Sequence, residues 1–104
     1  MPDIPRVKAE FFKALGHPLR IRVLELLSTG EHTVSELLAE VDAEQPALSQ
    51  QLAVLRRAGF VGTRREGANV VYALADERIA DVLAVSRQVL LDMATATRDE
   101  LAAS

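Results

Sequence analysis

The segment at residues 45–59 constrains the fold of this chain more than any other, because its leucines recur at helical spacing. They lie four and three residues apart and share one face of an α-helix: Leu48, Leu52 and Leu55. Pro46 suits the first helical position, and Gly59 suits the position past the helix end, which requires a positive φ. The segment therefore predicts an amphipathic helix with defined ends.

The opposite face of this predicted helix is short and polar. A solvated helix surface normally carries Lys and Glu pairs, but the first two turns here carry none. They carry Gln45, Ala47, Ser49, Gln50 and Gln51. Amides and hydroxyls read the edges of DNA bases. Arg56 and Arg57 in the last turns either complement the helix dipole or contact phosphates. The pattern alone fits a recognition helix and an ordinary amphipathic helix equally well.

A short helix is predicted just before this segment. Thr33 and Glu36 form a capping box, in which a hydroxyl and a carboxylate three residues later satisfy backbone N–H groups at a helix start. Residues 42–44 form the turn between the two helices. Two short helices joined by three or four residues, the second tipped with small polar side chains, are typical of a helix-turn-helix.

A β-hairpin is predicted directly after Gly59. Residues 60–65 and 70–74 are rich in β-branched and aromatic side chains, and they flank a glycine-bearing tip at residues 66–69. A hairpin in this place is a wing, and three of its side chains are placed to reach phosphates or the minor groove: Arg64, Arg65 and Asn69. The alternative is an edge strand whose charges protect it in solvent.

Three further helices complete the predicted order. Residues 4–15 form an amphipathic helix that ends at Gly16, and Pro18 opens a second helix, dense in Leu, Ile and Val, at the centre of the core. Asp76 caps a long last helix that runs close to the C-terminus. The expected fold class is therefore mainly α with a β-hairpin, a winged helix-turn-helix.

The apolar stripes of the first and last helices are longer than so small a domain can cover by itself. We therefore expect a homodimer in which these two helices meet around a two-fold axis. The expected interface residues are Ile4, Val7, Phe11, Val82, Leu83, Ser86, Leu90, Met93 and Thr97. In the alternative, a monomer, the last helix folds back on the first.

Composition narrows the class of protein. We expect a single domain over residues 1–104, and 49% apolar but only 4% aromatic residues predict a core of aliphatic side chains in a helical fold. The absence of cysteine excludes disulfides, thiolate metal sites and thiol redox chemistry. No apolar run approaches about 18 residues and no signal peptide is evident, so we expect a cytoplasmic protein without membrane contact.

The formal charge of −3 is divided unevenly along the chain. Residues 45–75 carry four arginines against Glu66 alone, whereas the segments before and after are acidic. A basic segment on an acidic body would orient the molecule on a polyanion and keep its non-specific binding modest. The charge pattern therefore indicates nucleic acid as the partner.

The order of elements resembles the arsenic-repressor (ArsR/SmtB) family of bacterial winged-helix transcription regulators over nearly the full length. The motifs that carry the likeness lie at residues 12–22, 45–61 and 64–72. The resemblance implies a homodimer paired through its first and last helices, with the helix that begins near Gln45 bound to an operator. Gln51 stands where many relatives have His.

The resemblance does not supply a signal. The family's thiolate pair in the third helix would fall at Leu38 and Glu40, and its other metal site needs histidines that residues 76–104 lack. His17 precedes Pro18, where an N-terminal cap or a packed turn residue is expected, and His32 lies just before Thr33. We therefore expect no metal site and no cofactor. The alternative is a metal-responsive regulator with an atypical site of His and carboxylate ligands.

These observations predict a sequence-specific DNA-binding transcription regulator. We expect a homodimeric repressor on an imperfect palindromic operator of double-stranded DNA, with an unknown effector. The alternative is a winged-helix module that binds proteins. An enzyme is not expected, because the chain has no Cys, no Gly-rich phosphate loop and no His beside an evident nucleophile.

Overall fold

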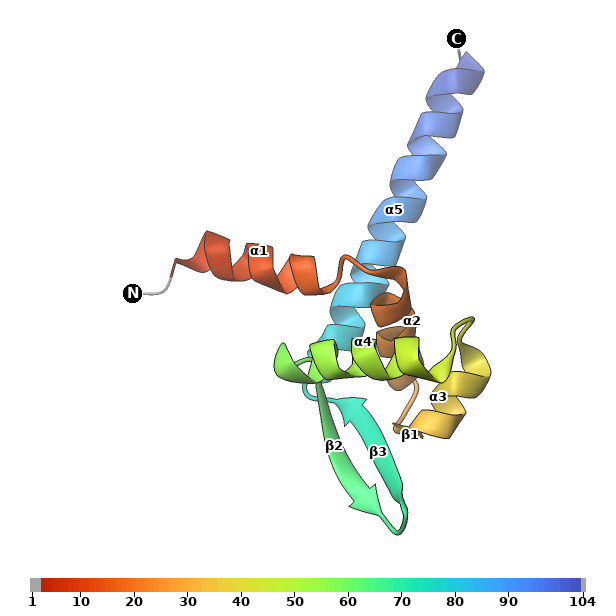
Figure 1. The fold of residues 1–104 in the computed structure, drawn as a ribbon. Helices are drawn as coiled ribbons and strands as arrows, with labels where there is room; N and C mark the ends of the chain where they lie inside the picture. The colour runs from red at the N-terminus through yellow and green to blue at the C-terminus, as the bar shows by residue number, and fades with distance from the viewer. Residues whose placement is uncertain (1–2, 104) are drawn as a thin grey trace.

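The computed structural model describes residues 3–103, and its elements follow the predicted order (Figure 1). They are α1 (Ile4–Ala14), α2 (Pro18–Leu27), β1 (His32–Thr33), α3 (Val34–Glu40), α4 (Gln45–Arg57), β2 (Val61–Glu66), β3 (Asn69–Leu74) and α5 (Arg78–Ala103). The helices α2 to α4, the strands and the start of α5 form a head. Two arms, α1 and residues 84–103 of α5, project from it in different directions (Figure 1). This architecture confirms the winged helix-turn-helix.

The core lies in the head and is almost entirely aliphatic. Its buried members are Leu15, Val23, Leu24, Leu27, Leu37, Leu48, Leu52, Leu55, Phe60, Val61 and Ile79. The leucines predicted for the buried face of α4 are at most 1% exposed. Because these side chains anchor α4 along most of its length, the orientation of the helix is fixed and its opposite face is left to solvent.

The starts of α2 and α3 are satisfied by the side chains that the sequence indicated. His17 caps α2, since its Nδ1 accepts the backbone N–H of Leu19 at 3.1 Å. At the start of α3, Thr33 Oγ1 accepts the Glu36 N–H at 3.2 Å and Glu36 Oε1 accepts the Thr33 N–H at 2.8 Å. The backbone and hydroxyl hydrogen bonds from Thr33 lower the pKa of the Glu36 carboxyl. The capping box is therefore confirmed, and it sets the start of the first helix of the helix-turn-helix.

Several predicted boundaries shift by one residue: α1 ends at Ala14, β2 ends at Glu66 and β3 begins at Asn69. Helix α4 begins at Gln45, so Pro46 occupies the second helical position, where the missing N–H also costs nothing because the first-turn N–H groups have no helical partner. Strand β2 begins at Val61, because Phe60 turns into the core and its N–H bonds the Leu55 carbonyl at 2.9 Å. Gly59 has a φ of +83°, as predicted for the residue past the end of α4.

The hairpin belongs to a three-stranded antiparallel sheet in the order β1-β3-β2. Glu66 pairs with Asn69 across a two-residue turn that places Gly67 at a φ of +62°. The strand β1 was not predicted, and it pairs with β3 through His32 opposite Tyr72. Two residues are too few to show an alternating pattern, so only their pairing defines them as a strand.

The carboxylate of Asp76 makes the stability of the fold depend on pH. It pairs with the Arg78 guanidinium at 2.7 Å and accepts the Arg78 backbone N–H at 2.9 Å, as predicted for the cap of α5. These contacts, the side-chain one foremost, lower the pKa of Asp76 from 3.8 to about 2. Since the folded pKa lies below the unfolded one, this contribution is present above about pH 4 and is lost as the pH falls towards about 2.

We therefore expect Asp76→Asn to flatten the fall in unfolding free energy between about pH 4 and pH 2. Thermal unfolding followed by circular dichroism at a series of pH values measures this. Glu77→Gln is the matched control, because Glu77 forms no ion pair within residues 3–103. A wild-type pH profile in Asp76→Asn would contradict the assignment.

Candidate DNA-binding surface

The polar face of α4 lies on the surface, opposite the buried leucines. Gln45, Ala47, Ser49 and Gln50 are exposed and Gln51 is partly buried. Within residues 3–103, none of these side chains is hydrogen-bonded to the protein. Their amide and hydroxyl groups are therefore free to donate to and accept from another molecule.

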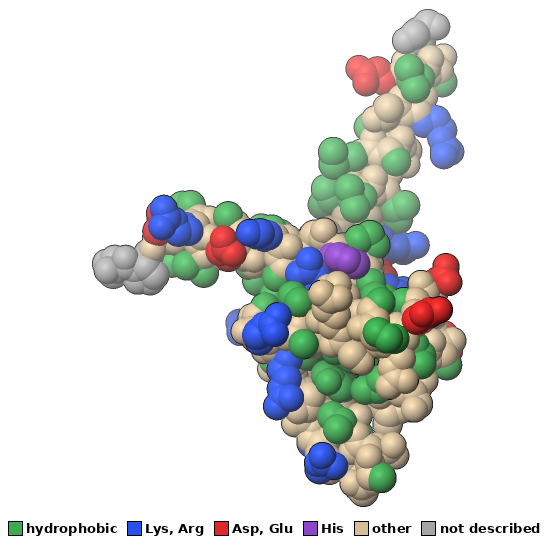
Figure 2. All heavy atoms as spheres, viewed as in Figure 1, with side chains coloured by type: hydrophobic (Ala, Val, Ile, Leu, Met, Phe, Trp, Pro, Cys, Tyr) green, Lys and Arg blue, Asp and Glu red, His purple; other side chains and the backbone are tan. Residues whose placement is uncertain are grey.

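The end of α4 is basic. Arg56 and Arg57 occupy its last turn and are exposed, and across the described chain neither forms an ion pair. Figure 2 shows Lys and Arg side chains over the end of α4 where the wing begins and along the wing. The positive charge that the sequence placed in residues 45–75 is therefore gathered on α4 and the wing.

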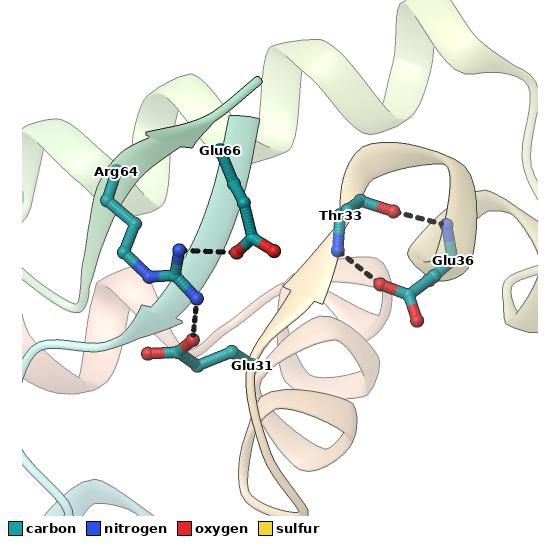
Figure 3. Close-up of polar contacts among 5 residues, drawn as sticks. All are labelled: Glu31, Thr33, Glu36, Arg64 and Glu66. Carbon is teal, nitrogen blue, oxygen red and sulfur yellow. Dashed lines mark hydrogen bonds and ion pairs between the residues drawn. The ribbon is translucent and has the colours of Figure 1, made fainter. Parts of the chain in front are cut away.

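The two arginines of the wing have different surroundings. Arg64 donates to Glu31 Oε2 at 2.6 Å and to Glu66 Oε2 at 2.5 Å (Figure 3). The hydrogen bonds to Glu31 and then Glu66 raise the pKa of the Arg64 guanidinium. Arg65 is exposed and forms no ion pair with any described residue. Asn69, opposite Glu66, is also exposed.

The partnership of Arg64 with Glu31 could not be found from the sequence. Glu31 lies 33 residues earlier, directly before β1. No spacing rule links two residues so far apart in the chain, because the sheet alone brings them together.

A second surface is apolar and covers the two arms. Its large exposed side chains are Ile4, Val7, Phe12, Val85, Val89, Leu90, Leu91, Met93 and Leu101. Figure 2 shows hydrophobic side chains along both arms. No residue of α1 is buried, and every residue from 84 to 103 is exposed. The arms therefore gain little from packing on their own protomer.

The residues predicted for a dimer interface fall into two groups. Six are exposed on the arms: Ile4, Val7, Ser86, Leu90, Met93 and Thr97. Phe11, Val82 and Leu83 are partly buried against the core of the head instead, with the Phe11 ring centroid 5.0 Å from that of Phe60. The hydroxyls of Ser86 and Thr97 are bonded to carbonyls of their own helix, those of Leu83 and Met93.

Among residues 3–103, no three His, Cys, Asp or Glu side chains lie close enough together to hold a metal ion. The two histidines are apart in the fold, since His17 caps α2 while His32 lies in β1. In the same range, no helix has the length and apolar character needed to cross a membrane.

Comparison with known proteins identifies the family. The model of the family described as bacterial regulatory proteins of the arsR family matches residues 17–63. The uncharacterized HTH-type transcriptional regulator Rv0081 of Mycobacterium tuberculosis is 55% identical over 86 residues, which cover 82% of this chain and 75% of that protein. The biofilm growth-associated repressor of Agrobacterium fabrum is 47% identical over 75 residues, covering 72% of this chain and 64% of that protein.

Solved structures indicate the same family as the sequence comparison. The crystal structure of M. tuberculosis Rv0081 has a TM-score of 0.85 and 48% identity, covering 93% of this chain and 98% of that one. The homodimeric winged helix-turn-helix DNA-binding domain of Mb0332 from Mycobacterium bovis has a TM-score of 0.75 and 30% identity, covering 88% of each chain. The chain therefore belongs to the ArsR family of winged helix-turn-helix transcription regulators, which confirms the resemblance found in its motifs.

Proposed function

We propose that this protein is a homodimeric repressor that binds an imperfect palindromic operator. The observation that carries the proposal is the free, exposed row of amide and hydroxyl side chains on α4, held by leucines that are at most 1% exposed. A rigid helix with unpaired donors and acceptors reads bases well, because little conformational entropy is lost on binding.

The proposed contacts divide by chemistry. Base edges in the major groove are read by Gln45, Ala47, Ser49, Gln50 and Gln51. Arg56 and Arg57 contact backbone phosphates, because they follow the polar face along the same helix and carry unpaired charge. On the wing, Arg65 reaches the backbone beside the site. Arg64 is already paired with two carboxylates, and Asn69 lies on the same face of the sheet as Arg64.

A second copy of the chain covers the arms in this proposal. The apolar residues of α5 begin in the core with Ile79 and continue past the head, where no other described residue buries them. Helix α1 likewise has no buried residue. Exposed apolar surface of this extent is stabilised by association. A two-fold axis through both arms also provides the two recognition helices that a palindrome requires.

We propose that the protein represses transcription rather than activating it, and two points support this. The relative from A. fabrum is named a repressor. A dimer bound across a promoter also blocks access to it without further contacts. Because the chain has no cysteine, we propose that its signal is not a thiolate-bound metal.

We expect footprinting on the promoter of its own gene to show two half-sites in inverted orientation, about 34–36 Å apart from centre to centre. The spacing follows from two recognition helices in successive major grooves on one side of the duplex. A duplex with one half-site scrambled is the control, and it should bind at least about tenfold more weakly. Protection of one unrepeated half-site by a monomer would contradict the proposal.

A further inference from the structure

The two arginines of the wing lie on opposite faces of the sheet. Successive side chains of a strand point to opposite faces, and the register places Arg64 opposite Val71 and Arg65 opposite Val70. Adjacent residues of one type therefore meet different surroundings. In the sequence the two arginines look equivalent, but in the fold they are not.

The face that carries Arg64 is acidic. A depression of about 170 Å³ on this face is lined by Glu31, Glu36 and Glu66 together with Arg64, and two of these carboxylates bond the guanidinium directly (Figure 3). Three carboxylates against one guanidinium leave the depression negative, so it repels a phosphate rather than attracting one. The charge of Arg64 is already neutralised within the protein.

Arg64 also joins two strands that do not pair with each other. In the order β1-β3-β2, Arg64 and Glu66 lie on β2, while Glu31 directly precedes β1 on the far side of β3. The guanidinium thus spans the sheet and links the wing to the segment that leads into α3. Because β1 contributes only two residues to the sheet, this link adds a contact to an edge that otherwise pairs only with β3.

We propose that Arg64 is a positioning residue that holds the wing to the turn before β1, and that Arg65 is the arginine of this pair that contacts DNA phosphates. The inference rests on the proposed DNA binding. It assigns opposite behaviour to two neighbouring residues of the same type, which makes Arg64 and Arg65 matched controls for each other.

The first test is the salt dependence of duplex binding, followed by fluorescence anisotropy. Arg65→Ala lowers the slope of log K against log[salt] by about 0.9 for each phosphate that the variant no longer neutralises, or about 1.8 for a dimer on two half-sites. Arg64→Ala keeps the wild-type slope and weakens binding less than about fivefold, because its ion pairs are half exposed and screened. A reduction of the slope in Arg64→Ala equal to that in Arg65→Ala would overturn the assignment.

Two further variants separate charge from position. Lysine keeps the charge of Arg64 but cannot bridge two carboxylates with a planar fork, so Arg64→Lys behaves like Arg64→Ala. Glu31→Gln leaves the guanidinium paired with Glu66 alone and weakens the link to the turn before β1, so it also weakens binding slightly at an unchanged slope. The rival assignment, in which Arg64 contacts phosphate and Glu31 restrains it, predicts tighter binding and a steeper slope in Glu31→Gln. That result would overturn the proposal.

A measurement on the free protein tests the link without DNA. Arg64→Ala and Glu31→Gln should speed amide hydrogen exchange in β2 and β3 about two- to fivefold, while Arg65→Ala leaves it at the wild-type rate. Unchanged exchange in both variants would overturn the positioning role. Failure of the wild-type protein to bind any duplex would instead count against the proposed function, since the exchange result does not depend on it.

Discussion

Leu90→Arg is expected to convert the proposed homodimer into monomers and to lower operator affinity with it. Leu90 is 63% exposed in the protomer and lies on the apolar stripe of the α5 arm, which we assign to the interface. A guanidinium without a partner in an apolar interface costs about 3–5 kcal/mol. This cost raises the dimer dissociation constant by a factor on the order of 10²–10⁴. Sedimentation velocity at a series of protein concentrations measures the change.

The matched control for this variant is Gln88→Arg. Gln88 lies on the opposite side of α5, where its amide donates to the Asp92 carboxylate at 2.9 Å. The same guanidinium at this site should leave the dimer intact, and circular dichroism should show both variants folded. A dimer of wild-type strength in Leu90→Arg would place the interface elsewhere.

Ser49→Ala and Gln51→Ala are each expected to cost on the order of 1–3 kcal/mol on the operator and to relax base preference. Ser49 is exposed on α4 and Gln51 is partly buried beside the leucine face, and neither side chain is bonded to the protein within residues 3–103. Removing their polar groups takes away base contacts without disturbing an internal network. Anisotropy titrations against the operator and its single-base variants, at one stated salt concentration, measure both effects.

Arg57→Ala provides the contrast for these base-reading variants. It removes a proposed phosphate contact at the other end of the same helix. We expect it to weaken operator and unrelated duplex alike and to reduce the salt slope, because phosphates carry no sequence information. If Ser49→Ala or Gln51→Ala weakened all duplexes equally, those residues would not be reading bases.

The helix-turn-helix could be predicted from the sequence because local contacts specify it. The leucine spacing of α4, the capping box of Thr33 and Glu36, and the positive φ of Gly59 all depend on residues within about four positions of one another. The same holds for the His17 cap and for the hairpin, whose two-residue turn joins adjacent strands. In these places the local pattern and the final fold agree.

The candidate site could be predicted only in part. The exposed face of α4 follows from the period of its buried leucines, so its polar residues were identifiable before the structure. The separate surroundings of Arg64 and Arg65 were not, because strand alternation reveals that they point apart but not what lies on each side. Glu31 becomes the partner of Arg64 only when β1 has paired with β3.

The apolar stripe of α5 shows the same division. By itself the sequence determined that the stripe exists and that it is too long for one small domain. Only the tertiary structure decided that Val82 and Leu83 pack on the core of the head while Leu90 and Met93 lie beyond it, and that Phe11 packs on Phe60. Periodicity tells which side of a helix is apolar, because side-chain direction is a local property. The point at which other elements stop covering that side depends on segments distant in the chain. These segments meet only when the whole domain has folded.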